Sequence, residues 1–370
     1  MSEGTVFVGL DVHKATISAA IAEDGRSHPT AIGVIANEPE AVRKLFGGLR
    51  QRFTDIHVAY EAGPTGYGVQ RQLTAMGIDC RVVAPSQIPK RAGDRVKTDR
   101  RDAEKLARLL RSGDLDAIWV PNEAHEAMRN LVRARADAQK DLIRDRARLR
   151  TFLLRSGRPT PEGTRTTSQR YDRWLDTLEF DHREDHIVFG EYRASVRASV
   201  DRVKRIETAL FELAQLGQHA DLIRALQVFR GVGMLTAITL VSELGDFRRF
   251  PTARHLMAYV GIVPSEHSSG TTRSRGRITK AGNHLLRFAL IESAHHSRRP
   301  PRISPGLKQR QEGMPPELIE MSWKAQKRLH FRYRQLGNRI GRPKALVAVA
   351  REFTGFIWAA GQMWEGHNAA

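Results

Sequence analysis

The sequence lacks most of what disulfide-bonded, zinc-binding or membrane proteins require. Cys80 is the only cysteine among 370 residues, so an intrachain disulfide and a cysteine-based zinc site are both excluded. No apolar run approaches the roughly 18 residues of a membrane-spanning helix, and no basic helix has a strongly apolar face. The acidic start at residues 1–3 predicts no secretory signal. We therefore expect a cytoplasmic protein without a membrane partner.

Acidic residues are also scarce relative to basic ones. Asp and Glu number 41 against 60 Lys and Arg, which leaves a formal net charge of +19. Residues 271–345 alone hold 18 Lys or Arg against four Glu, and no Asp. Such an excess favours a polyanionic partner, because each neutralised phosphate releases counterions. We expect nucleic acid, bound mainly by the last third of the chain.

The apolar pattern of the first third predicts a mixed α/β domain. Continuous or alternating apolar residues indicate strands, and apolar residues three or four positions apart indicate helices. Three early strands followed by alternating helices and strands is the order of a ribonuclease H-like fold. The expected strands cover residues 5–12, 15–22, 31–36, 56–60, 80–84 and 117–120, and the expected helices cover residues 40–53, 67–76 and 100–111.

The rest of the chain is expected to be mainly helical. Apolar seams over residues 128–152, interrupted at Arg135 and Asp145, and over residues 196–213 predict two long amphipathic helices. These form an antiparallel hairpin that either pairs with another subunit or packs on its own domain. Two further helices, over residues 222–229 and 234–244, flank a Gly-Val-Gly turn. This arrangement indicates either a helix-hairpin-helix that binds phosphate or a plain corner between helices.

Four carboxylates recur at the ends of the elements in the first third. Asp11 and Glu61 lie at the ends of the first and fourth predicted strands, and Asp99 and Asp102 lie on one face of a helix start. Each has a purely structural alternative, as a helix cap, a first-turn acid or a turn residue. Together they predict a carboxylate cage that binds Mg2+ or Mn2+ and assists a phosphoryl displacement.

A run of hydroxyl side chains and glycines lies inside a basic cluster in the last third. Residues 265–270 are Ser-Glu-His-Ser-Ser-Gly, and Arg273, Arg277 and Lys280 follow closely. Hydroxyl, arginine and lysine side chains are suited to contact with a phosphodiester. Taken alone, the Ser-Ser-Gly segment is also compatible with a plain loop.

These motifs together resemble one known family, the DEDD insertion-sequence transposases of the IS one-ten family. The match covers nearly the whole chain in the order of the family, and it is poorest over residues 156–190 and after Trp364. The segments that carry it are VGLDVHK at 8–14, YEAG at 60–63, KTDRRDA at 97–103, GIVP at 261–264, HSSG at 267–270 and GRITKAGN at 276–283.

The resemblance implies a three-part chain. A RuvC-like domain is expected over residues 1–122, a coiled-coil connector over residues 123–218, and a C-terminal transposase domain over residues 219–370. Members move their element between DNA sites, and in one branch a bridge RNA pairs with donor and target DNA. The implied partners are therefore donor DNA, target DNA, a bridge RNA and further copies of the chain, in a tetramer built as a dimer of dimers.

The resemblance also implies roles for individual residues. The nucleophilic serine of the family falls on Ser269, with Ser268 as the alternative, and its hydroxyl attacks a DNA phosphodiester to give a phosphoserine link. Arg273, Arg277 and Lys280 are the expected charge stabilisers. The metal-binding and catalytic tetrad falls on Asp11, Glu61, Asp99 and Asp102.

Two alternative functions remain open on the sequence alone. In the first, the chain is a site-specific invertase or a junction-resolving nuclease whose carboxylates cut with water, and Ser269 only contacts DNA. In the second, it is a nucleic-acid-binding protein with a decayed nuclease-like domain, against which the intact tetrad argues. Guidance by RNA rests on the resemblance only, because basic charge does not distinguish RNA from DNA.

Overall fold

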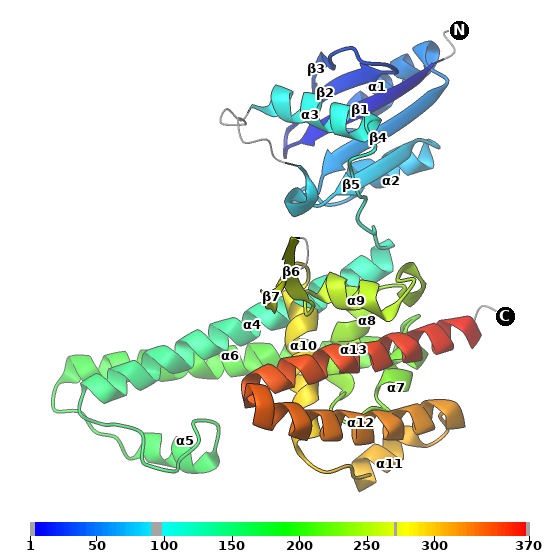
Figure 1. The fold of residues 1–370 in the computed structure, drawn as a ribbon. Helices are drawn as coiled ribbons and strands as arrows, with labels where there is room; N and C mark the ends of the chain where they lie inside the picture. Colours follow the sequence, from blue (N-terminus) through cyan, green and yellow to red (C-terminus); the bar gives the residue numbers. More distant parts are fainter. Residues whose placement is uncertain (1–3, 90–97, 270–271, 368–370) are drawn as a thin grey trace. The chain divides into compact units, whose positions relative to one another are not determined.

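The computed structural model describes residues 4–89, 98–269 and 272–367 of the chain. They belong to two compact units, Met1–Pro121 and Asn122–Ala370 (Figure 1). Each unit has a hydrophobic core of its own. Within the described ranges, no helix is long and apolar enough to cross a membrane.

The N-terminal unit is built on a mixed five-stranded sheet with strand order β3-β2-β1-β4-β5. The first three strands form an antiparallel meander, and β4 and β5 extend the sheet in parallel with β1. β1, which carries Asp11, therefore lies directly beside β4, which carries Glu61. The strands are β1 (Thr5–Val12), β2 (Thr16–Glu23), β3 (Thr30–Ala36), β4 (Asp55–Glu61) and β5 (Asp79–Val83).

Helices cover both faces of this sheet. Val6, Val8 and Leu10 of β1 are buried on one face, because side chains alternate along a strand, and Phe46 and Leu49 of α1 lie in the same core. A second cluster, to which α3 contributes, packs against the opposite face. The helices of the unit are α1 (Pro39–Arg52), α2 (Gly68–Ala75), the 3-10 helix η1 (Pro85–Gln87) and α3 (Asp99–Arg111).

The prediction of a strand over residues 117–120 is wrong. This segment makes a single bridge from Ala117 to Val83, and the Ile118 N–H donates to the Val82 carbonyl oxygen at 2.7 Å. Pro121 follows and has no N–H to continue a ladder. The segment therefore contacts the edge of the sheet without becoming a sixth strand.

The C-terminal unit is mainly helical and begins with a long hairpin. α4 (Glu123–Arg155) and α6 (Arg183–Leu216) pack along each other, and the segment that joins them contains α5 (Gln169–Asp176) (Figure 1). The two polar interruptions of the predicted seam are paired across the hairpin. Arg135 Nε donates to Glu207 at 2.8 Å, and Ser199 Oγ donates to Asp145 at 2.5 Å.

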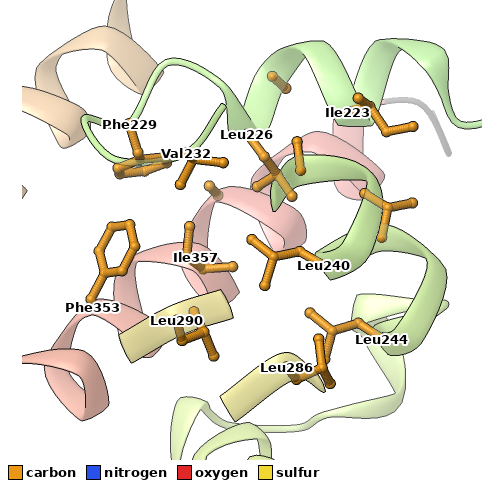
Figure 2. Packing of buried hydrophobic residues seen from close by; sticks show 14 of the residues in the cluster. Ile223, Leu226, Phe229, Val232, Leu240, Leu244, Leu286, Leu290, Phe353 and Ile357 are labelled. Atoms are coloured by element: carbon orange, nitrogen blue, oxygen red, sulfur yellow. The ribbon is translucent and has the colours of Figure 1, made fainter. Parts of the chain in front are cut away.

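The remaining helices of this unit surround one large core. Figure 2 shows Leu226, Phe229 and Val232, from the end of α7 and the turn after it, beside Phe353 and Ile357 of α13. The elements are α7 (Ala220–Leu226), α8 (Met234–Leu244), η2 (Phe247–Arg249), α9 (Ala253–Val260), α10 (His284–Ala294), η3 (His295–Arg298), α11 (Pro305–Gln311), α12 (Pro316–Ile340) and α13 (Arg342–His367).

Two features of this unit differ from the sequence prediction. α7 ends at Leu226 rather than at Phe229, because the Val228 and Phe229 N–H groups bond three residues back and form a turn. The unit also contains an antiparallel hairpin of β6 (Pro264–Ser269) and β7 (Thr272–Ile278). The sequence did not predict this hairpin, because its strands are rich in Ser and Arg and lack apolar alternation.

Candidate active site

Asp11 lies on the face of the sheet that α3 covers. Phe7 and Gly9 share this face because side chains alternate along β1. A Cβ atom at Gly9 would lie 2.1 Å from the Ala103 carbonyl oxygen and 2.4 Å from the Ala107 nitrogen. Glycine therefore allows the α3 backbone to approach β1 closely, and this contact brings the first turn of α3 towards Asp11.

α3 begins with two of the predicted carboxylates. Thr98 is the N-cap, and its Oγ1 accepts a hydrogen bond from the Arg101 N–H at 3.4 Å. Asp99 is the first residue of the helix, and Asp102 also lies in the first turn, where negative charge is favourable. The capping role that was open for Asp99 is thus filled by Thr98.

His13 lies between the end of β1 and the start of α3. Its Nε2 is 3.3 Å from Asp11 Oδ2 and 3.5 Å from Asp99 Oδ1. One ligand atom from each of these three residues lies within 4.8 Å of the other two. We call Asp11, His13 and Asp99 the β1–α3 cluster. The Asp11 side chain is 18% exposed and the other two are more than half exposed, so the cluster is open to solvent.

The charges around Asp11 favour a bound cation. Burial raises the pKa of the Asp11 carboxyl; the negative charges of Asp99 and Asp102 raise it further, and His13 opposes this effect. Carboxylates that repel one another in this way are stabilised when a cation binds between them. Carboxylate oxygens suit Mg2+ and Mn2+, and an imidazole nitrogen suits a transition metal such as Mn2+ better than Mg2+.

Glu61 lies at the end of β4, directly beside β1. Leu10 and Tyr60 are register partners, which places the backbone of Glu61 next to that of Asp11. Among the described residues, the Glu61 carboxylate forms no hydrogen bond or ion pair with the β1–α3 cluster. The structure therefore groups two of the four predicted carboxylates with His13. It places Asp102 close enough to raise the pKa of Asp11, and Glu61 on the adjacent strand.

The sequence interpretation assigned no role to His13. The residue follows β1 directly, and its N–H donates to the Thr16 carbonyl oxygen at 2.8 Å in the turn to β2. The missed signal was its distance of two residues from Asp11, since residues two apart at the end of a strand share one face. A histidine beside a predicted ligand is itself a candidate ligand.

The predicted serine lies in the other unit, on the β6–β7 hairpin. Ser269 is the last residue of β6 and is the register partner of Thr272, while Ser268 is the partner of Arg273. The side chains of Ser268, Ser269 and Arg273 lie outside the described part of the structure. Arg277 is exposed on β7.

Two close backbone approaches fix the base of this hairpin. A Cβ atom at Gly261 would lie 1.9 Å from the Ala281 carbonyl oxygen, and one at Gly282 would lie 2.0 Å from the Tyr259 carbonyl oxygen. Between these contacts, the Lys280 N–H donates to the Gly261 carbonyl oxygen at 3.1 Å, and Lys280 has a left-handed φ of 55°. The hairpin is therefore attached to the end of α9 through backbone contacts.

A buried carboxylate holds the segment after the hairpin. Glu243 of α8 is 1% exposed and accepts two hydrogen bonds from Arg133 of α4, at 2.8 and 2.9 Å. It accepts a third from Asn283 Nδ2 at 2.6 Å. The Asn283 Oδ1 in turn caps α10, accepting from the Leu285 and Leu286 N–H groups. One ionic network therefore joins α4, α8 and the start of α10.

Comparison with known proteins gives consistent matches over both units. Residues 223–306 match the family described as Transposase IS116/IS110/IS902 family, and residues 8–157 match the DEDD transposase family of IS110. The protein y4qE of Sinorhizobium fredii, described as a transposase, is 43% identical over 356 residues, which cover 95% of this chain and 87% of that protein.

Two further relatives are transposases of named insertion sequences. The transposase for insertion sequence element IS1533 of Leptospira borgpetersenii is 32% identical over 334 residues, which cover 90% of this chain and 96% of that protein. The transposase for insertion sequence element IS1111A of Coxiella burnetii is 26% identical over 226 residues, which cover 60% of this chain and 61% of that protein.

Proposed function

Because the chain belongs to the IS116/IS110/IS902 family of insertion-sequence transposases, we propose that it recombines DNA with active sites that combine the carboxylates of one subunit with the serine of another. As a transposase, it is a DNA-binding enzyme of phosphoryl transfer. The metal-binding part is the β1–α3 cluster together with Asp102 and Glu61, and the nucleophile is Ser269. The proposal is carried by the approach of Asp11, His13 and Asp99 at the site where the strand and helix meet.

The residues around Asp11 fit a divalent cation. Asp11 and Asp99 supply oxygen ligands, His13 supplies a nitrogen ligand, and the repulsion among Asp11, Asp99 and Asp102 is relieved by positive charge. Glu61 is the remaining candidate ligand, because its backbone lies beside that of Asp11. A bound Mg2+ or Mn2+ ion would supply charge stabilisation for a phosphodiester that is being cleaved.

Ser269 is the proposed nucleophile of the C-terminal unit, with Ser268 as the alternative. The seryl Oγ forms a bond to phosphorus and loses its proton, while the bond from phosphorus to the leaving deoxyribose oxygen breaks and that oxygen takes a proton. Arg273, Arg277 and Lys280 are proposed to neutralise the phosphate during this exchange. The position of Ser269 on a hairpin in a basic segment supports the assignment.

The proposed organisation follows the family. The five-stranded sheet with α3 supports a RuvC-like, ribonuclease H-like domain over residues 1–122. The α4–α6 hairpin supports a coiled-coil connector over residues 123–218, and residues 219–370 form the transposase domain with the helix-hairpin-helix-like pair α7 and α8. We further propose a tetramer, built as a dimer of dimers, that uses a bridge RNA to select donor and target DNA.

The test of this function is recombination between two plasmids, one with the junction of the element and one with a candidate target, with the flanking noncoding DNA supplied. Wild-type protein is expected to recombine them, and Asp11→Ala and Ser269→Ala are each expected to abolish the product. If the Ser269→Ala variant cleaves DNA at the wild-type rate, the chain is a metal-dependent nuclease or an invertase that uses water.

The role of RNA has a separate test. Copurification of an RNA of discrete length is expected, and treatment with ribonuclease is expected to remove recombination until that RNA is added back. Full recombination activity after complete removal of RNA would exclude guidance and leave the two-part active site unaffected.

A further inference from the structure

A basic cluster lies at the end of α10 that is opposite to the β6–β7 hairpin. β7 precedes the N-terminus of α10 and η3 follows its C-terminus, so the helix of 11 residues separates the two regions by roughly 16 Å (Figure 1). The cluster combines side chains from the α7–α8 turn, η3, the segment after it and α11. We call the following residues the η3 basic cluster: Arg230, His296, Arg299, Arg302 and Arg310.

The positive charges in this cluster are not balanced by acids. Among the described residues, none of its arginines forms an ion pair with a carboxylate. Burial lowers the pKa of Arg230, and the charges of Arg299 and Arg302 lower it further. Burial also lowers the pKa of His296, as do Arg230, Arg299 and Arg310. The cluster therefore carries mutual repulsion that a bound anion would relieve.

A buried donor without a partner lies in the same place. Gln326 of α12 is 7% exposed and lines a cavity of about 20 Å3 with Arg230, His296 and Arg299. Its Oε1 accepts from the Arg302 N–H at 3.2 Å and lies 3.5 Å from Arg230 Nη1, which fixes the orientation of the amide. Its Nε2 is buried and, among the described residues, has no hydrogen-bond partner. Such a group is costly to bury unless an acceptor reaches it.

Packed rings and hydrogen bonds surround this cavity. Phe229 and Phe353 line it and pack edge to face, with ring centroids 5.9 Å apart (Figure 2). Arg230 Nη1 donates to the Pro300 carbonyl oxygen at 2.6 Å, and the Arg310 guanidinium donates to the Val232 carbonyl oxygen. Arg230 and Arg310 are thus already positioned without a ligand, which lowers the cost of binding one.

We propose that the η3 basic cluster binds one phosphodiester group of a nucleic-acid backbone. One non-bridging oxygen enters the cavity and accepts from Gln326 Nε2, and Arg230 and Arg299 neutralise the group at the rim. The cavity is about large enough for one oxygen atom of water size, so the rest of the phosphate stays outside. An acceptor-only, anionic ligand matches a site whose unsatisfied groups are donors and cations. The site lies at the opposite end of α10 from the hairpin that carries Ser269.

The test is binding by the full-length protein in the presence of a chelator, so that neither cleavage nor metal binding contributes. Fluorescence anisotropy is measured over a range of salt with labelled duplex DNA of about 30 base pairs and with RNA of the same length. The variant Arg299→Ala/Arg302→Ala removes two exposed charges, and it is expected to bind roughly tenfold more weakly and to lower the salt slope by about one. If the variant loses affinity for DNA alone or for RNA alone, that nucleic acid is the source of the phosphate.

Two further variants make the result specific. Arg334→Ala/Arg339→Ala removes two exposed charges that lie beyond Gln326 on α12, and it is expected to leave the affinity within about twofold of wild type. Gln326→Glu keeps the Oε1 acceptor and replaces the donor with an anionic oxygen. It is expected to weaken binding at least as much as the double variant, with a melting temperature no lower than that of the wild type. If Gln326→Glu and Arg299→Ala/Arg302→Ala both bind as wild type does, the cavity holds only water and the proposal is wrong.

Discussion

Single residues determine where the carboxylates of the N-terminal unit lie. Gly9 permits the contact between β1 and α3, Thr98 caps the helix, and His13 lies between Asp11 and Asp99. Of these three, only Thr98 has a role that is common at a helix start. Gly9 acts by leaving space for the α3 backbone, and His13 acts by providing a ligand atom. Each role can be tested by its own substitution.

Gly9→Ala is expected to destabilise the N-terminal unit by about 2 to 3 kcal/mol, because the new methyl group would overlap the α3 backbone and force the helix away from β1. The measurement is the free energy of unfolding in urea. Gly48→Ala in α1 is the matched control, since a Cβ atom there meets none of the described residues within 4 Å. The control is expected to stabilise the protein by about 0.5 to 1 kcal/mol. Equal effects of the two changes would contradict the role given to Gly9.

His13→Ala is expected to weaken Mn2+ binding about tenfold and Mg2+ binding less, because an imidazole nitrogen suits Mn2+ better than Mg2+. Titration calorimetry with each ion measures this without any DNA present. Lys14→Ala, which changes the exposed neighbour, is expected to have little effect. Unchanged Mn2+ affinity in the His13 variant would restrict the ligands to the carboxylates.

At the scale of elements, two buried polar contacts join the long hairpin to the rest of the C-terminal unit. One is a pair of histidines. His125 Nε2 donates to the Ser242 carbonyl oxygen at 2.8 Å, so a neutral His125 presents its Nδ1 as an acceptor to His219 Nε2 at 2.9 Å. Protonation of the pair would bring two N–H groups face to face. This contact excludes a proton on both rings at once, and burial lowers the pKa of each ring, so both are expected to be neutral in the folded protein.

The histidine pair predicts a loss of stability in mild acid. Burial lowers the pKa of His219 from the ordinary 6.5 to about 4, with a contribution from His125. Between these values the unfolded chain binds more protons than the folded one, so the free energy of unfolding decreases as the pH falls. Glu365, whose pKa burial raises to about 7, gives a slope of opposite sign in this range, so the contribution of His219 is the difference between wild type and a His219 variant in urea unfolding between pH 6.5 and about 5.

His219→Gln is expected to reduce this pH dependence, and His186→Gln, at an exposed position of α6, is expected to retain it. If the His219 variant has the slope of wild type, the pair does not control the acid response. The comparison separates this effect from any general change in net charge.

The other contact is the network around Glu243. Glu243→Ala is expected to cost about 2 to 3 kcal/mol, because Arg133 and Asn283 lose a buried acceptor that holds three elements together. Thermal unfolding of this variant is compared with that of Glu212→Ala, an exposed position of α6. A loss no greater than in the control would mean that the network does not stabilise the unit.

Much of the element order could be predicted from the sequence. β1, α1 and β4 could be predicted from the spacing of their apolar residues, because the same residues within each element are the ones that are buried. Three segments that were missed have no such pattern. α5 is short and follows a run of polar residues, and β6 and β7 pair through backbone groups with few apolar side chains. His13 was missed because its role depends on α3, which is distant in sequence.

At the scale of the whole molecule, the proposed chemistry divides between two units. The carboxylates belong to the sheet unit, and the serine and most of the excess positive charge belong to the helical unit. Neither unit alone carries both parts, so loss of either part is expected to abolish recombination. The η3 basic cluster lies in the helical unit together with Ser269, but at the other end of α10, so its phosphate-binding proposal is tested separately from the catalytic one.

The most direct measurement of the central claim is the identification of the residue that becomes linked to DNA. Protein incubated with radiolabelled junction DNA and Mg2+ is denatured, digested and examined by mass spectrometry for a nucleotide-modified peptide. The proposal predicts a phosphodiester on Ser269, absent in Ser269→Ala and in Asp11→Ala. A modified peptide centred on Ser268 would correct the nucleophile, and DNA cleavage that requires Asp11 but gives no modified peptide would contradict the proposed two-part active site.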